Sequence, residues 1–109
     1  MKQITATKAI PPVTVIYRFD GRFIYLKCGN MQYASQIIAN IKARGGIILQ
    51  GTKTNFMQIN IFGNNDFIKI GNNEINVNES KSEEIETILI NFFLMNLKKA
   101  GFETKLEDI

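Results

Sequence analysis

The chain has 109 residues, of which 45% are apolar and 21% are charged, and its formal net charge is +3. These values fit one globular domain and exclude a wholly disordered chain. The sequence contains no histidine and one cysteine, Cys28, which excludes Ser-His and Cys-His nucleophiles, His-containing zinc sites and an internal disulfide.

From these exclusions we expect a protein that is not an enzyme and that uses no cofactor or metal. Paired carboxylates occur only at Glu83-Glu84 and Glu107-Asp108, where we expect solvated side chains rather than acid-base chemistry. The mild positive charge is compatible with a nucleic-acid partner, but it is too small to demonstrate one.

Residues 1–12 end in Pro11-Pro12, which favours an extended N-terminal arm in front of a single α+β domain at residues 13–109. The first ten residues, MKQITATKAI, lack the apolar core of a secretory signal. No segment approaches the roughly 20 apolar residues of a membrane span. We therefore expect an intracellular protein, in the cytoplasm or with the nucleoid or nucleus, that has no membrane partner.

The first hairpin is predicted at residues 13–19 and 22–28, with Asp20-Gly21 as its tight turn. This register places Phe19 opposite Arg22. One face is then almost wholly apolar and should point to the core; it carries Val15, Tyr17, Phe19, Ile24 and Leu26. The opposite face carries Thr14, Ile16, Arg18, Phe23, Tyr25 and Lys27.

Apolar residues at helical spacing predict a helix over residues 31–44, ended by Gly45-Gly46. Two strands are expected next, at residues 47–50 and 54–61, around a turn at residues 51–53. In the second of these strands, polar and aromatic residues alternate with aliphatic ones. The polar and aromatic set is Phe56, Gln58 and Asn60.

A second hairpin is predicted around Asn72-Asn73, because that register gathers four aliphatic residues on one face: Ile68, Ile70, Ile75 and Val77. The other face receives Phe67, Lys69, Glu74 and Asn76. A helix follows, capped by Ser80 or Ser82 and ended by Gly101. The hairpin-helix plan thus occurs twice, and each unit is too small to bury its own apolar face. We expect one curved antiparallel sheet with two helices on one face, in the order ββα-ββ-ββα.

The second helix has more apolar surface than packing on a sheet requires. One interpretation is a helix wedged between the sheet and the first helix. The other is an interface with a protein partner or with a second copy of the chain, formed by Ile90, Leu94 and Leu97, because large exposed apolar patches mark interaction sites.

The segment at residues 76–109 resembles the end of a repeat in the TATA-box-binding protein family. Ser80-Lys81-Ser82-Glu83-Glu84 is similar to the link before that family's long helix, and Ala100-Gly101-Phe102 is similar to its Gly-Phe stop. Asp20-Gly21-Arg22 is similar, more loosely, to the Ser-Gly-Lys of its hairpin. The resemblance implies a shortened copy of that fold and a DNA-binding role, such as that of a transcription or architectural factor.

Phenylalanines of that family wedge between base steps in the minor groove. Matching the hairpins by their turns puts Arg18 or Tyr17 at the first wedge position and Lys69 or Ile70 at the second. The resemblance therefore supports the fold more than it supports kinking of a TATA box.

The residues themselves also suggest a site, on the sheet face that the helices leave uncovered. Aromatic rings stack on bases or wedge between them, cations neutralise phosphates, and amides read groove edges. The expected nucleic-acid-binding residues are Arg18, Phe23, Tyr25, Lys27, Phe56, Gln58, Asn60, Phe67 and Lys69. The expected partner is nucleic acid, duplex DNA in preference to RNA. The alternatives are ordinary solvation of an exposed sheet and, for the whole chain, a protein-interaction module acting through its last helix.

Overall fold

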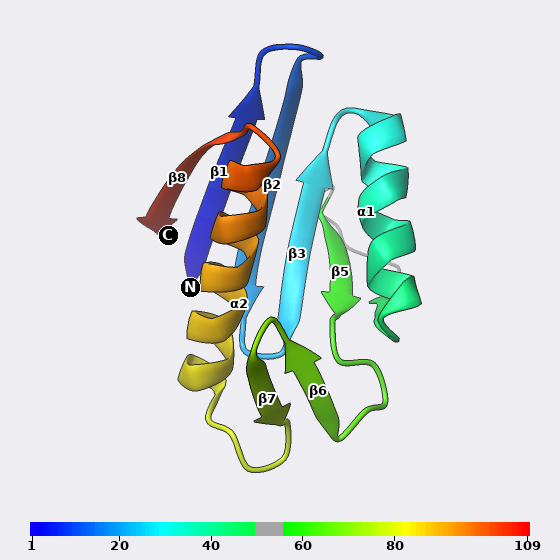
Figure 1. Ribbon diagram of the computed structural model, residues 1–109, viewed down its shortest axis with the longest axis vertical. Helices are drawn as coiled ribbons and strands as arrows, with labels where there is room; N and C mark the ends of the chain where they lie inside the picture. The colour runs from blue at the N-terminus through cyan, green and yellow to red at the C-terminus, as the bar shows by residue number, and fades with distance from the viewer. Residues whose placement is uncertain (50–55) are drawn as a thin grey trace.

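A computed structural model describes residues 1–49 and 56–109 of the chain (Figure 1). Within these ranges there are eight strands and two helices, in the order βββα-ββ-ββ-αβ. The strands are β1 (Lys2–Lys8), β2 (Val13–Asp20), β3 (Phe23–Cys28), β4 (Ile47–Leu49), β5 (Met57–Asn60), β6 (Phe67–Ile70), β7 (Asn73–Asn76) and β8 (Glu103–Asp108). The helices are α1 (Met31–Ala43) and α2 (Ser82–Lys99). The turn expected at residues 51–53 lies outside the described residues.

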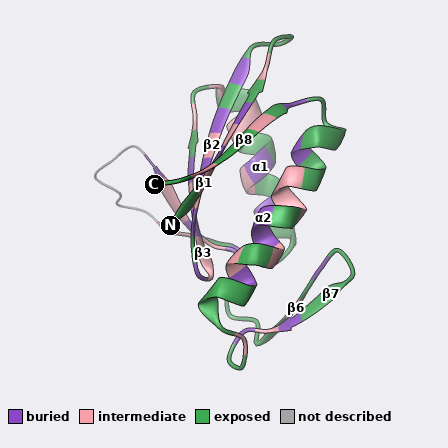
Figure 2. Cartoon of the chain, turned by 90° about the vertical axis from the view of Figure 1, so that its left-hand side faces the viewer, coloured by how far each residue is buried: buried purple, intermediate pink, exposed green. Residues whose placement is uncertain are grey.

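Six strands form an antiparallel sheet in the order β4-β5-β3-β2-β1-β8. Both helices lie on one side of this sheet, as the edge-on view of Figure 2 shows. The short β6–β7 hairpin forms a second sheet on the same side, near the N-terminal end of α2 (Figures 1 and 2). The expected α+β class, with a mostly antiparallel sheet and two helices, is confirmed.

The N-terminal residues are extended, but they do not form an arm outside the domain. Residues 2–8 are strand β1, which pairs with β2 on one side and with β8 on the other. Ile4 and Ala6 on this strand are completely buried. The backbone N–H of Ile109 donates to the carbonyl oxygen of Met1 at 3.1 Å, so the first and last described residues are adjacent. Residues 1–12 thus belong to the domain that we expected to begin at residue 13.

Both predicted hairpins form, and both differ from the expected register by two residues. Phe19 pairs with Ile24 instead of Arg22, and Ile70 pairs with Asn73. The turns are Gly21-Arg22 and Gly71-Asn72, and in each the glycine comes first, with φ of 58° and 60°. Tight hairpin turns need a positive φ at their first central position, which glycine adopts without strain. Because side chains alternate with period two, a two-residue shift leaves every side chain on its predicted face.

The second hairpin does not join the main sheet, so the expectation of one sheet containing both hairpins is wrong. Each edge of the first hairpin is already occupied, since β3 pairs with β5 and β2 pairs with β1. The β6–β7 hairpin instead buries its apolar face in the core through Ile70, Ile75 and Val77. The grouping of aliphatic residues was predicted correctly, but the hairpin packs on helix α2 and not on a neighbouring strand of the main sheet.

The main core lies between the six-stranded sheet and the helix layer. Phe93 of α2 contacts two aromatic rings of β2, with centroid distances of 4.8 Å to Tyr17 and 5.7 Å to Phe19. Buried side chains on the helix side of the sheet include Ile4, Ala6, Val15, Tyr17, Phe19, Ile24, Leu26 and Ile59. The expected core face of the first hairpin is confirmed. Burying each large apolar side chain contributes about 2 kcal/mol to the free energy of folding.

Helix α2 begins after Lys81, whose side chain makes no capping hydrogen bond, so the expected cap by Ser80 or Ser82 is wrong. Glu83-Glu84 in the first turn and Lys98-Lys99 in the last turn complement the helix dipole. Within the described part of the chain, neither helix has the length and apolar character needed to cross a membrane.

Candidate nucleic-acid interface

The sheet face opposite the helices carries a polar row that crosses five strands. Five residues occupy successive positions along it: Gln58 on β5, Tyr25 on β3, Arg18 on β2, Gln3 on β1 and Glu107 on β8. Each residue is the direct cross-strand neighbour of the next. Their side chains therefore project from one face at the regular spacing of the sheet.

Hydrogen bonds connect most of this row. The amide nitrogen of Gln58 donates to the Tyr25 hydroxyl at 3.3 Å, and Arg18 Nε donates to Gln3 Oε1 at 2.9 Å. Gln3 Nε2 donates in turn to Glu107 Oε1 at 3.3 Å. These bonds hold the polar side chains in fixed positions, which lowers the entropic cost of presenting them to a ligand.

Phe56 lies just before β5 and supports the cations of this face. It is only 7% exposed, yet it lies outside the main core cluster. The Arg18 guanidinium lies 4.3 Å from its ring centroid, and Lys27 Nζ lies 5.7 Å from it. Such cation–π contacts orient a charged group without neutralising it. We expected Phe56 to contact nucleic acid, but its burial makes it a support for Arg18 and Lys27.

Two other predicted aromatic residues remain accessible on the uncovered face. Phe23 and Tyr25 lie on β3, near the centre of the six strands, and both are half-buried. Asn60 lies directly across from Phe23 on β5. Its amide nitrogen donates to the Gly63 carbonyl oxygen at 3.2 Å, so Asn60 serves partly to hold the local loop.

Charge on this face is balanced, but it is not evenly distributed. The cations Arg18 and Lys27 are on central strands, whereas Glu103 and Glu107 are on the edge strand β8. Lys105 on the same edge lies 3.8 Å from the Glu107 carboxylate, which offsets its charge. A polyanion would therefore meet positive charge at Arg18 and Lys27. It would meet negative charge at the β8 edge and at Asp20, which lies on the same face directly across from Phe23 at the end of β2.

Phe67 and Lys69 do not belong to this surface. Both are on β6, in the separate hairpin on the helix side of the sheet, and Phe67 is 61% exposed there. Their assignment to the nucleic-acid site is corrected. The alternation of residues along β6 was predicted correctly, but alternation does not say which sheet a strand joins.

Two of the three residues that would form a partner interface on α2 are buried within the chain. Ile90 and Leu97 are 6% and 4% exposed because they pack in the core of their own chain. Leu94 is partly buried and packs against the same core. The large apolar surface of α2 is used within the chain, against the main sheet and the β6–β7 hairpin.

Gln3 and Glu107 were missed by the sequence analysis. Ile4 and Ala6 alternate with Gln3 and Thr5, which is a strand signal within the segment that we expected to be an arm. Glu107 was expected to be a solvated tail residue. The alternation in residues 3–6 therefore indicated a strand, but it did not indicate that this strand pairs with β8.

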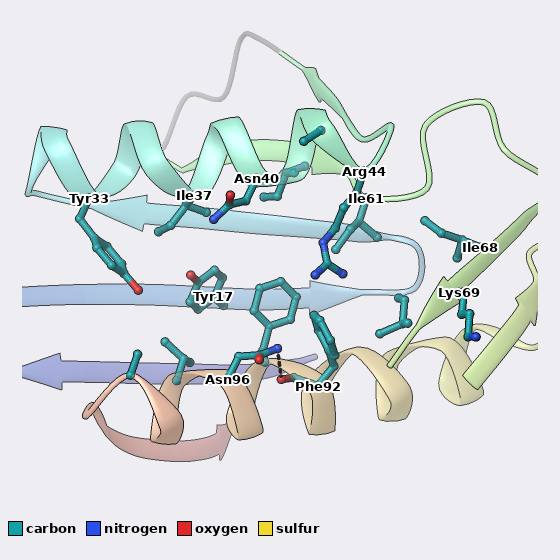
Figure 3. A pocket seen from close by; sticks show the side chains of 16 residues that line it. Tyr17, Tyr33, Ile37, Asn40, Arg44, Ile61, Ile68, Lys69, Phe92 and Asn96 are labelled. Atoms are coloured by element: carbon teal, nitrogen blue, oxygen red, sulfur yellow. Dashed lines mark hydrogen bonds between the residues drawn. The ribbon is translucent and has the colours of Figure 1, made fainter. Parts of the chain in front are cut away.

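A cleft of about 670 Å³ lies on the other side of the sheet, between α1 and α2 (Figure 3). Its floor includes Tyr17, and β6 closes one end. The residues that line it are mainly aliphatic and aromatic, with two cations and two amides: Tyr17, Tyr33, Ile37, Asn40, Ile41, Ala43, Arg44, Ile61, Ile68, Lys69, Ile70, Phe92, Phe93, Asn96, Leu97 and Ala100. Burial raises the pKa of the Tyr17 hydroxyl above its ordinary value, so this group is a neutral hydrogen-bond donor near pH 7.

No protein-family model, no curated protein and no solved structure matches this chain. The resemblance to the TATA-box-binding protein family therefore depends only on the residues quoted for it.

Proposed function

We propose that this protein is a non-enzymatic DNA-binding protein that contacts nucleic acid through the uncovered face of its six-stranded sheet. The observation that carries the proposal is the position of Phe23 and Tyr25 on the central strand β3, with Arg18 and Lys27 beside them. Rings on a sheet face stack on bases, and adjacent cations contact the phosphates.

The arrangement favours stacking over wedge insertion. Phe56 is buried beneath Arg18, and Phe67 lies on another sheet, so Phe23 and Tyr25 are the aromatic side chains left for contact. Half-buried rings on a sheet face offer a platform for unpaired bases. We therefore propose single-stranded DNA as the preferred ligand. Duplex DNA, which the family resemblance implies, is the ligand to compare with it.

The charge distribution sets the footprint of the ligand. The strand should run over β2, β3 and β5 and avoid β8, because Glu103 and Glu107 on that edge repel phosphates. With Arg18 and Lys27 each neutralising one phosphate, the logarithm of affinity should fall with the logarithm of salt concentration with a slope of about −1.4 for a single strand.

Fluorescence anisotropy with labelled single-stranded and duplex oligonucleotides, at several salt concentrations, tests the proposal. Tyr25→Ala should weaken single-strand binding by about tenfold, since one stacked base contributes about 1–3 kcal/mol. Lys27→Gln should lower the salt slope by about 0.7, because it removes one phosphate contact.

Phe67 and Lys69, which were expected on this face but lie outside it, supply the matched controls. Phe67→Ala removes an exposed aromatic side chain outside the face, and Lys69→Gln removes a cation outside it. Both variants should bind like the unmodified protein. Equal losses for Tyr25→Ala and Phe67→Ala, or no salt-sensitive binding to either oligonucleotide, would refute the proposal, provided that circular dichroism shows folded variants.

A further inference from the structure

The cleft lies between the two helices and is lined along both of them. One wall follows α1 from Tyr33 to Arg44, and the other follows α2 from Phe92 to Ala100. At about 1.5 Å per residue the α1 wall extends for about 16 Å. The cleft's volume of about 670 Å³ falls in the range of small-molecule sites. The shape thus suits an extended ligand.

The two ends of the cleft differ in charge. Arg44 reaches from α1 across the cleft toward α2, where its guanidinium lies 5.1 Å from the ring centroid of Phe92 (Figure 3). Lys69 borders the same end of the cleft from β6, but it alternates with Ile68 and Ile70, so its ammonium points away from the cleft (Figure 3). No Asp or Glu is among the described residues that line the cleft, and neither cation makes an ion pair within the described ranges. The Arg44 end of the cleft is therefore positively charged and can bind an anion.

The remainder of the cleft is apolar with a few hydrogen-bonding groups. Ile37, Phe93 and Leu97 supply aliphatic and aromatic walls. The Tyr33 hydroxyl points into the space from α1, and Tyr17 lies at the floor (Figure 3). A ligand that fills this part must bury carbon surface, which is favourable at about 25 cal/mol per Å².

We propose that this cleft binds an unbranched aliphatic carboxylate, with its chain between α1 and α2 and its carboxylate at Arg44. The guanidinium can form two parallel hydrogen bonds with a carboxylate, and stacking on Phe92 holds it in place. An uncharged chain would leave Arg44 without an anion. The inference is independent of the proposed function, because the cleft lies on the opposite side of the sheet from Tyr25.

Isothermal titration calorimetry with dodecanoate, dodecanol and acetate tests this assignment. Dodecanoate should bind to one site, dodecanol should bind about fivefold more weakly because it has no charge, and acetate should not bind measurably. Equal affinity for dodecanoate and dodecanol would overturn the carboxylate assignment. Absence of dodecanoate binding would overturn the site as a whole.

Two variants and one matched control locate the ligand. Arg44→Gln should weaken dodecanoate binding about fivefold and leave dodecanol binding unchanged. Lys42→Gln removes an exposed cation from the last turn of α1, two residues before Arg44 and outside the cleft, and it should have no effect. Asn96→Trp places a bulky ring in the cleft and should abolish binding of both chains. Equal effects of Arg44→Gln and Lys42→Gln, or binding that survives Asn96→Trp in a folded variant, would contradict the proposal.

Discussion

At the scale of single residues, similar backbone angles have different consequences at Gly63 and Gly71. Both have a positive φ, 58° and 60°, which L-residues with a side chain rarely adopt. A Cβ on Gly71 would have open space, since its nearest neighbour is Phe92 Cδ2 at 3.9 Å. A Cβ on Gly63 would overlap the backbone carbonyl oxygen of Gly45. Gly63 is therefore required for backbone contact between two loops as well as for its dihedral angle.

Alanine substitution separates the two causes. Gly71→Ala should reduce the free energy of unfolding by about 1–2 kcal/mol, the cost of the left-handed conformation. Gly63→Ala should reduce it by about 4 kcal/mol or more, because the backbone near Gly45 must also move. Urea denaturation of the two variants measures the difference. Equal losses of unfolding free energy would show that the backbone at Gly45 does not lie against Gly63.

The Arg18 side chain makes two contacts within the chain that support its proposed role as a phosphate contact. Its Nε bonds to Gln3, and its guanidinium lies over Phe56. Each contact restricts its rotamers before any ligand arrives, which reduces the ordering cost on binding. A cation held in this way is a better phosphate contact than a freely moving lysine on a loop.

At the scale of elements, helix α2 carries a broad apolar stripe because it packs on two neighbours. Ile85, Leu89, Ile90 and Leu97 are buried, and their spread around the helix reflects packing against both the main sheet and the β6–β7 hairpin. Helices that pack on two neighbours require a wider apolar stripe than helices that pack on one. The broad stripe therefore has an explanation within the chain.

Serine substitutions on α2 test that explanation. Ile90→Ser should lower the free energy of unfolding by about 4 kcal/mol, because it leaves a cavity and buries a hydroxyl. Met95→Ser, at a position that is 46% exposed, should lower it by less than about 1 kcal/mol. Thermal unfolding reports stability, and size-exclusion chromatography reports association. If Ile90→Ser keeps full stability but dissociates an oligomer, Ile90 belongs to a partner interface after all.

At the scale of the whole molecule, the N-terminal strand holds the sheet together. Strand β1 lies between β2 and β8, so its backbone hydrogen bonds connect the first hairpin to the last strand. Both chain ends therefore contribute to one continuous sheet. The uncovered face that carries the proposed DNA site also depends on β1, since Gln3 bonds to Arg18.

Removal of residues 1–8 should prevent cooperative folding, because it deletes buried Ile4 and Ala6 and the pairing partners of β2 and β8. Removal of residues 103–109 should leave a folded protein of lower stability, because it deletes an edge strand and little buried apolar surface. Circular dichroism with thermal melting distinguishes the two outcomes. A cooperative transition in the chain lacking residues 1–8 would show that this segment is an arm that the fold does not require.

Local patterns in the sequence determined both helices and all the described strands except β1 and β8, and they determined which face each residue of the two hairpins occupies. Alternation around Gly21 and Gly71 placed Tyr25 and Ile75 on the correct faces, because the side-chain period of a strand is independent of its partner. For the same reason, alternation placed six of the seven expected site residues from Arg18 to Asn60 on one surface, and the burial of Phe56 changed its role.

Only the tertiary structure decided which strands meet. Strand β1 joins β2 and β8, the β6–β7 hairpin leaves the main sheet, and Phe67 and Lys69 leave the expected site with it. Strand pairing depends on which edges remain free after the rest of the chain has packed, and that is a property of the whole molecule. The cleft between α1 and α2 has the same origin, since its walls come from residues that are distant in the sequence.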